Sequence, residues 1–313
     1  MDIERFKPYF PIATLVVLFV VVGAANPQFF NLAGIVSLMA DVVPLFVMAL
    51  GMTFAIYIGG IDLSMQQLAN LVTVVATVYL ARFGIGVAAV CILAGVLFGA
   101  VSGYVTTRHF VPSFVSTLAV GFVALSAAKY LSGERALYMD STLRDDSFGW
   151  MFGNTAGIPH ELAIAAILLA IGWVIQTRTT FGRSLKAVGA GELAAVASGL
   201  NVDKIKIIAF ALSGMFAAIA GLMFSVKLSG GDANLANGFL LLAIVAVLVG
   251  GTPLTGGVGG VVNTAIGTLI VMVIRAAMVY LEIDATHQQM IFGIVLIVAI
   301  ALTIDRSKLR IVK

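Results

Sequence analysis

Ten apolar runs constrain the fold of this chain more than any other feature of its sequence. A helix that crosses a bilayer needs about 20 consecutive apolar residues, and runs approaching that length fill most of the chain. They cover residues 9–25, 44–58, 65–81, 86–105, 113–131, 161–176, 205–226, 239–250, 258–280 and 287–304. Residues 32–43 are also apolar, and with Pro44 after them they can form the first half of a longer, kinked second span. The sequence therefore predicts an all-α integral membrane protein with about ten transmembrane helices.

The composition excludes the main soluble classes of protein. Apolar residues make up 61% of the chain and charged residues only 11%, where soluble domains carry about 25% charged residues. Such a chain cannot cover a soluble fold with polar surface, so we expect neither a soluble enzyme nor a nucleic-acid-binding protein. The single cysteine, Cys91, lies in an apolar run, and the three histidines share no ligand spacing. We therefore expect no disulfide, no metal site and no cofactor.

The distribution of positive charge predicts the orientation in the membrane. If both termini lie in the cytoplasm, most of the 18 Lys and Arg residues fall in cytoplasmic segments, as the positive-inside rule requires. Two connections are longer than turns, an outer loop at about 132–160 and an inner segment at about 177–204. We expect one transmembrane domain over 1–313, with a first half (1–160) and a second half (161–313).

A short motif occurs near the same point of each half. One apolar run ends at Gly59-Gly60-Ile61-Asp62-Leu63-Ser64, and another ends at Gly250-Gly251-Thr252-Pro253-Leu254-Thr255. Glycine and proline interrupt helices, and paired interrupted segments in corresponding halves point to a translocation pathway. This predicts discontinuous segments and a weak two-half repeat. The alternative is that both motifs are ordinary turns between helices, which would have the same sequence pattern. An acid at membrane depth such as Asp62 usually faces a cavity or a partner, and it can also cap a helix that starts near Ser64.

The inner segment contains a candidate docking helix. Residues 192–198 suit a short helix, and Gly199 supplies its C-terminal stop. Glycine and basic residues flank it, which favours a site where a partner docks. The alternative is an interfacial helix that lies on the lipid, and the small, alanine-rich apolar face disfavours it.

Other small and polar residues have plainer interpretations. Gly95, Gly99 and Gly103 recur every four residues, which allows close packing between helices. Arg275 lies near the predicted outer end of its span and marks the membrane interface. Only Asp41 and Asp62 are acids predicted at membrane depth, which argues against a proton- or sodium-driven carrier. The chain also has no G-x-x-x-x-G-K-[ST] motif, so it is not itself a P-loop ATPase.

Several short blocks of residues follow one another in a characteristic order. They are Met52-Thr53-Phe54 before the 59–64 motif, Val111-Pro112-Ser113-Phe114 with Thr117-Leu118, Phe181-Gly182-Arg183, Ala194-Ala195 with Ser198-Gly199-Leu200-Asn201-Val202, Leu212-Ser213-Gly214, Gly250-Gly251-Thr252 with Gly256-Gly257, and Gln288-Gln289. In these blocks the chain resembles the membrane permease of the ribose-type ABC sugar importers, along almost its whole length. It departs from that pattern at Leu193, where a Glu is usual, at Met65-Gln66, where a small pair is usual, and at Leu240–Ala243, where acids are common.

The resemblance implies a machine with several partners. Two permeases, identical or paralogous, form the pathway in a bacterial inner membrane, a separate ATPase docks on the inner helix, and a periplasmic sugar-binding protein docks outside. The permease itself has no catalytic residue. The residues expected at the pathway are Gly59, Gly60, Asp62, Leu63, Ser64, Phe114, Thr117, Gly250, Gly251 and Thr252. The residues expected to couple to the ATPase are Gly182, Arg183, Glu192, Ala194, Ala195, Ser198, Gly199 and Val202.

These observations together predict the transmembrane subunit of an ATP-driven importer for a monosaccharide or related polyol, surrounded by membrane lipid. Three alternatives stay open. A nucleoside or branched-chain amino-acid permease keeps the machinery and changes the cargo. A stand-alone secondary carrier needs no partner, and the long basic inner segment disfavours it. A membrane-embedded enzyme lacks any catalytic constellation.

Overall fold

The computed structural model describes residues 9–303, and almost all of them lie in helices. The basic residues near both ends, which contribute to the predicted orientation, lie outside this range. The apolar helices of the described chain are α1 (Phe10–Ala25), α2 (Leu32–Tyr57), α3 (Met65–Phe83), α4 (Val87–Arg108), α5 (Ser113–Ser132), α7 (His160–Arg178), α10 (Val202–Lys227), α11 (Phe239–Val249), α12 (Val261–Tyr280) and α13 (Ala285–Thr303). The helical class is confirmed, since a chain in lipid must satisfy its backbone groups within each segment.

The helices differ in how clearly they can span a bilayer. Six helical segments of the described chain are long and apolar enough, one of which runs from α3 into α4 (Met65–Arg108). The apolar helices Phe10–Ala25 and Phe239–Val249 are shorter. The protein is therefore a multi-pass membrane protein, while the number of about ten spans stays a prediction.

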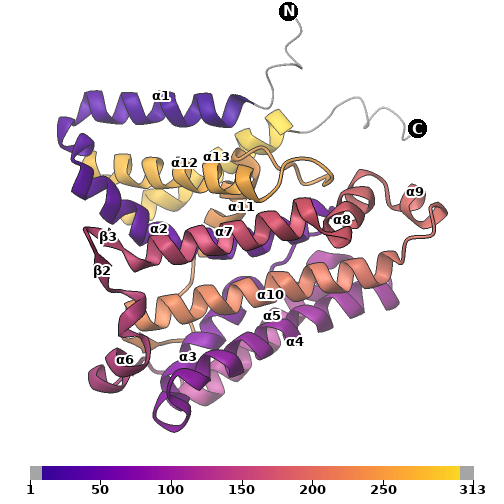
Figure 1. The fold of residues 1–313 in the computed structure, drawn as a ribbon, viewed down its shortest axis with the longest axis horizontal. Coiled ribbons are helices and arrows are strands. Elements are labelled where there is room, and N and C mark those ends of the chain that lie inside the picture. The colour runs from indigo at the N-terminus through magenta and orange to yellow at the C-terminus, as the bar shows by residue number, and fades with distance from the viewer. Residues whose placement is uncertain (1–8, 304–313) are drawn as a thin grey trace, which may run out of the picture.

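Two central helices form the core. Every residue of α2 from Val42 to Tyr57 is buried, and α10 packs against α2, α3 and α4. Figure 1 shows α10 and α4 running side by side. The expectation of a longer second span is confirmed, because α2 runs from Leu32 through Pro44. Its N-cap is Asn31, whose side chain accepts hydrogen bonds from the backbone of Ala33 and Gly34.

Short elements cluster at the two ends of the bundle. At one end the strand β1 (Leu137–Tyr138) pairs antiparallel with β4 (Gly230–Gly231), with Leu137 opposite Gly231. The same end carries α6 (Ser141–Phe148) and the hairpin of β2 (Asn154–Thr155) and β3 (Ile158–Pro159). The opposite end carries α8 (Thr180–Ala190) and α9 (Glu192–Ala197). Short 3-10 turns lie at Pro27–Phe30, Gly84–Gly86 and Gly149–Met151.

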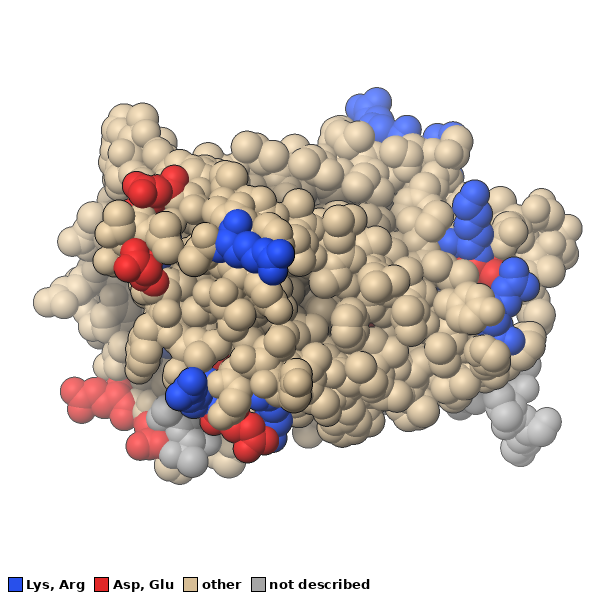
Figure 2. Space-filling view, turned by 90° about the horizontal axis from the view of Figure 1, so that it is seen from below, with Lys and Arg blue, Asp and Glu red and all other residues tan. Residues whose placement is uncertain are grey.

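Charges on one face of the molecule are separated along its length. In Figure 2, acidic residues with some basic ones gather at the end that carries α6, and Lys and Arg dominate the end that carries α8 and α9. The surface between these ends has few charges. An apolar belt between charged ends suits a protein that crosses a bilayer.

The glycine face of α4 packs directly on α10. A Cβ atom placed on Gly95 would lie 2.4 Å from the carbonyl oxygen of Gly214, and one on Gly99 would lie 2.1 Å from that of Phe210. A Cβ on Gly103 would lie 2.7 Å from the Cα of Ile207. The predicted close packing is confirmed, because no larger side chain fits between the two backbones.

This contact predicts a stability difference between two matched substitutions. Gly99→Ala places a methyl group against the α10 backbone, and we expect a loss of about 1–3 kcal/mol or more, the usual result of overpacking. Gly293→Ala in α13 meets no atom within 4 Å and should be neutral or slightly stabilising. Thermal unfolding of the detergent-solubilised variants measures both, and equal melting temperatures would contradict this packing.

Candidate functional site

The first glycine motif ends α2 with a left-handed turn. Gly59 has a φ of 76°, its backbone N–H donates to the carbonyl of Ile56 (2.8 Å), and the N–H of Gly60 donates to that of Ala55 (2.9 Å). These two bonds form a Schellman cap, in which the left-handed position favours glycine. The chain thus leaves the helix with two of its last carbonyls satisfied.

The second motif ends α11 in the same way, one residue out of register with the sequence match. Gly251 has a φ of 95°, and the N–H groups of Gly251 and Thr252 donate to the carbonyls of Leu248 (2.9 Å) and Val247 (3.1 Å). Gly59 therefore corresponds to Gly251, although the sequence motif aligns Gly59 with Gly250. Gly250 is the C-cap residue of α11 and keeps right-handed backbone angles. It needs to be small, since a Cβ would lie 2.2 Å from the carbonyl oxygen of Asn263.

The loops that follow these two caps meet each other and the end of α8. The N–H of Gly257 donates to the carbonyl of Tyr57 (2.9 Å). A Cβ on Gly189, near the end of α8, would lie 2.0 Å from that same carbonyl oxygen and 2.5 Å from the nitrogen of Gly257. We call residues 57–60, 189–190 and 250–257 the loop junction. It joins the two interrupted segments to the inner segment of the chain.

Asp62 fastens the first loop to α10. Its side chain is fully buried. One carboxylate oxygen accepts hydrogen bonds from the backbone N–H (3.0 Å) and hydroxyl (2.6 Å) of Ser64, and the other accepts from the hydroxyl of Ser213 (2.6 Å). Asp62 thus faces hydroxyl partners of its own chain, but it does not cap α3, whose N-cap is Ser64 and has no side-chain capping bond.

The start of α5 holds the other side of the same loop. The backbone N–H of Leu63 donates to the hydroxyl of Thr117 (3.0 Å), and that of Ile61 donates to the hydroxyl of Ser113 (3.1 Å). Thr117 is buried, whereas Phe114 is half exposed on the surface of the helix. In the second loop, the buried Thr252 accepts a hydrogen bond from the N–H of Gly260 (2.9 Å). The structure thus brings every predicted pathway residue to these loops and the adjacent helix start.

The predicted docking segment forms two short helices, α8 and α9. Gly182 in α8 is buried, and a Cβ there would lie 2.0 Å from the carbonyl oxygen of Gln176, while Arg183 is exposed. The predicted short helix is confirmed as α9, and Gly199, with a φ of 79°, ends it. The N–H groups of Gly199 and Leu200 donate to the carbonyls of Val196 (2.9 Å) and Ala195 (3.1 Å), which is again a Schellman cap.

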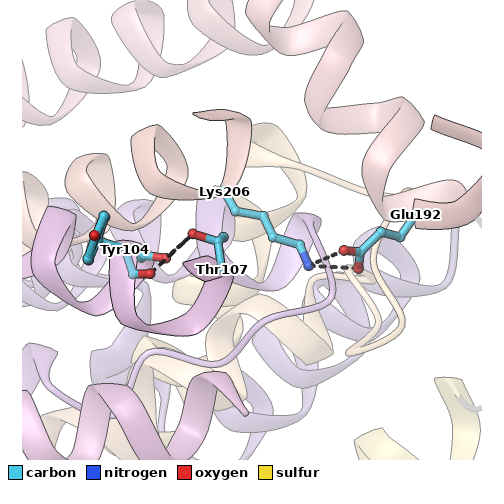
Figure 3. A network of polar contacts seen from close by, with 5 residues as sticks. Tyr104, Thr107, Glu192 and Lys206 are labelled. Atoms are coloured by element: carbon cyan, nitrogen blue, oxygen red, sulfur yellow. Dashed lines mark hydrogen bonds and ion pairs between the residues drawn. The ribbon is translucent and has the colours of Figure 1, made fainter. Parts of the chain in front are cut away.

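An ion pair and two buried side chains hold α9 to α10. The ammonium of Lys206 lies 2.7 Å from both carboxylate oxygens of Glu192, as Figure 3 shows. Ala195 and Val202 are buried, whereas Ala194, Ser198 and Gly199 are exposed. The apolar side chains of Leu193 and Val196 are 87% and 56% exposed. Leu193, which departs from the family pattern, therefore projects from the surface that the sequence assigns to docking.

The structure also reveals charged residues that the sequence interpretation missed. The ammonium of Lys227, at the end of α10, lies 2.9 Å from Asp41 of α2 and 2.9 Å from Glu161 of α7. Asp41 is thus paired and not isolated at membrane depth. The only sequence signal was that Lys227 and Glu161 fall near predicted outer ends of spans. Within the described chain, no three His, Cys, Asp or Glu side chains converge as metal ligands would.

Comparison with known proteins identifies the family to which the chain is similar. The family model described as "Branched-chain amino acid transport system / permease component" matches residues 34–300. The ribose import permease protein RbsC of Haemophilus influenzae is 33% identical, over 91% of this chain and 90% of the relative, and that of Escherichia coli (strain K12) is 32% identical, over 94% and 92%. The xylose transport system permease protein XylH of Haemophilus influenzae is 35% identical, over 51% of this chain and 42% of the relative. No solved structure matches the chain.

Both kinds of match cover the part of the chain that contains the glycine caps, the loop junction, α8 and α9. The matched family consists of permease components, and two relatives matched over most of the chain are named as ribose import permeases. The chain therefore belongs to the family of membrane permeases of ribose-type ABC importers.

Proposed function

We propose that this permease is the transmembrane subunit of an importer that carries a monosaccharide or related polyol across a bacterial inner membrane. A separate ATP-binding-cassette ATPase drives it from the cytoplasm, and a periplasmic binding protein delivers the sugar. Two copies, or one copy and a paralogue, enclose the pathway, with about ten spans in each and both termini in the cytoplasm. The observation that supports this proposal most is the loop junction, because it links a cytoplasmic docking segment to both interrupted segments.

The contacts suggest how motion passes from the ATPase to the membrane. A force on α9 reaches α10 through the Glu192–Lys206 ion pair, and α10 holds the first loop through Ser213 and Asp62. A force on α8 reaches the junction directly, through the close approach of Gly189 to Tyr57 and Gly257. Packed elements of this kind switch between discrete arrangements, which is what alternating access requires.

The relatives support sugar over other cargoes. The family model names branched-chain amino acids, whereas two relatives matched over most of the chain are named for ribose and a partial match is named for xylose. An ion-driven carrier needs acids that are free to exchange ions, but Asp62 is enclosed by Ser64 and Ser213 and Asp41 is paired with Lys227. In this proposal 1–313 is one domain whose halves are related through the two capped helices.

The first prediction concerns the energy source. The permease reconstituted with its ATPase and binding protein should take up sugar only while ATP is hydrolysed, because nothing in the proposed mechanism couples transport to an ion gradient. Uptake of radiolabelled sugar into proteoliposomes, with and without ATP and with an imposed proton or sodium gradient, measures this. Uptake that follows the gradient without ATP would contradict the proposal.

A second prediction concerns the docking surface. Leu193→Arg should weaken association with the ATPase by at least about tenfold, since a buried apolar anchor at an interface commonly contributes 1.4 kcal/mol or more. Leu193 is almost fully exposed, so folding should not change. Leu281→Arg, an exposed leucine beyond the end of α12, is the matched control and should keep full affinity. Copurification and titration with the ATPase distinguish the two, and equal affinities would place the docking surface elsewhere.

A further inference from the structure

A cavity of about 410 Å³ lies in the half of the molecule away from the loop junction. It opens between α2, α10, α11 and α12, and its volume falls in the range of about 300–1,000 Å³ typical of small-molecule sites. Its wall includes Asp41, Lys227, Phe224, Phe239 and Arg275. A second cavity of about 160 Å³ shares Phe239 and Arg275 with it and is also lined by Asn237, Gln288 and Gln289.

The charged groups of the larger cavity are unequally engaged. Lys227 is paired with Asp41 and Glu161 (both 2.9 Å) and also donates to the carbonyl of Ala40 (3.3 Å). Arg275 lies over the ring of Phe239, 5.8 Å from its centroid, and forms no ion pair with a carboxylate of the described residues. Its guanidinium thus keeps hydrogen-bond donors available at the boundary of the two cavities. Arg275 does more than mark an interface, because its side chain is part of both walls.

The chemistry of this wall favours a neutral solute with many hydroxyl groups. Asp41 and Glu161 balance Lys227 and Arg275 in charge, so an anion would be attracted by Arg275 but repelled by Asp41. The side chain of Asp41 is 62% exposed. A hydroxyl group both donates and accepts hydrogen bonds, so it can donate to the Asp41 carboxylate and accept from the Arg275 guanidinium. The neighbouring rings of Phe224 and Phe239, with centroids 4.5 Å apart, offer an apolar surface to the C–H groups of such a solute.

The position of α11 connects this cavity to the transport machinery. The helix begins at Phe239, in the cavity wall, and ends at the Gly250–Gly251 cap in the loop junction. The positive end of a short, interrupted helix commonly points at ligand oxygens in transporters. A solute held here would therefore contact one end of the helix whose other end leads into the loop that meets α8 at Gly257.

We propose that this cavity, between Arg275 and Asp41, is a solute-binding site of the permease itself, for a neutral polyhydroxylated molecule of monosaccharide size. The inference rests on the proposed function, since it names the place where the permease contacts the sugar that it carries. A mostly apolar pocket with a few converging polar groups is typical of a ligand site, and here the charged side chains combine with aromatic rings and a guanidinium that has no carboxylate partner among the described residues.

Protection of an introduced thiol tests this site. Val279 lines the cavity and is 68% exposed, so the Val279→Cys variant of the full chain, in phosphatidylcholine vesicles, should react with a maleimide. The native Cys91 is fully buried and gives a low background. Ribose, xylose and a panel of other neutral pentoses and hexoses are the test solutes. Val262→Cys, at the far end of α12 and 47% exposed, is the matched control.

We expect at least one neutral sugar to slow labelling at Val279→Cys and not at Val262→Cys. Adding Arg275→Gln should raise the protecting concentration by at least about tenfold, as expected for lost hydrogen bonds to a charged group. The inference is overturned if no sugar in the panel slows labelling of Val279→Cys, or if Arg275→Gln leaves the protecting concentration unchanged. It is also overturned if only phosphatidylglycerol added to the vesicles slows labelling, which would indicate a lipid site.

The two proposals fail separately. If a neutral sugar protects Val279→Cys from labelling but sugar uptake is the same with and without ATP, the binding site is supported and the proposed function is contradicted. If uptake depends on ATP, no sugar protects, and Arg275→Gln transports as well as the unmodified chain, the proposed function stands and the site fails.

Discussion

The need to satisfy every backbone hydrogen bond inside a bilayer governs this structure. Two apolar helices, α2 and α11, end where their sequence changes to paired glycines, and each end is closed by a cap with one left-handed glycine. Because the caps satisfy carbonyls at the ends of both helices, the chain can break its spans there. The broken ends then pair with each other, through the N–H of Gly257 and the carbonyl of Tyr57. The pathway proposed for the sugar therefore depends on the two helix caps, which satisfy the backbone hydrogen bonds where the spans are interrupted.

The same junction explains why the inner segment is rich in glycine. Gly189 must be small for α8 to reach the Tyr57 carbonyl, and Gly182 must be small for α8 to turn against Gln176. The sequence could therefore not vary freely in this segment without moving α8 away from the broken helices. Charge acts in a second place, where Glu192 and Lys206 join α9 to α10. Such an exposed pair adds little to global stability, so its main contribution is to fix the position of α9.

Sequence reasoning predicted much of the fold and less of the site. The helices follow the ten apolar runs because a run of about 20 apolar residues in lipid has few alternatives to a helix. The close helix packing at Gly99 and the end of the short helix at Gly199 could also be predicted, since both depend on local residue spacing. The sequence match pairs Gly59 with Gly250, one residue before the structural cap at Gly251, because Gly250-Gly251 does not reveal which glycine adopts the left-handed conformation. The cluster of Lys227, Asp41 and Glu161 was missed because it joins three helices that are distant in sequence.

The central claim is that contact between α8 and the loop junction couples ATP hydrolysis to transport. Its most direct test is the number of sugar molecules imported per ATP hydrolysed by the reconstituted importer that carries Gly189→Ala. A Cβ at this position would lie 2.0 Å from the Tyr57 carbonyl oxygen, so hydrolysis should continue while import per ATP falls sharply. Gly191→Ala, whose Cβ would meet no atom nearer than 3.9 Å, should keep the ratio of the unmodified chain. An unchanged ratio in Gly189→Ala would contradict the account.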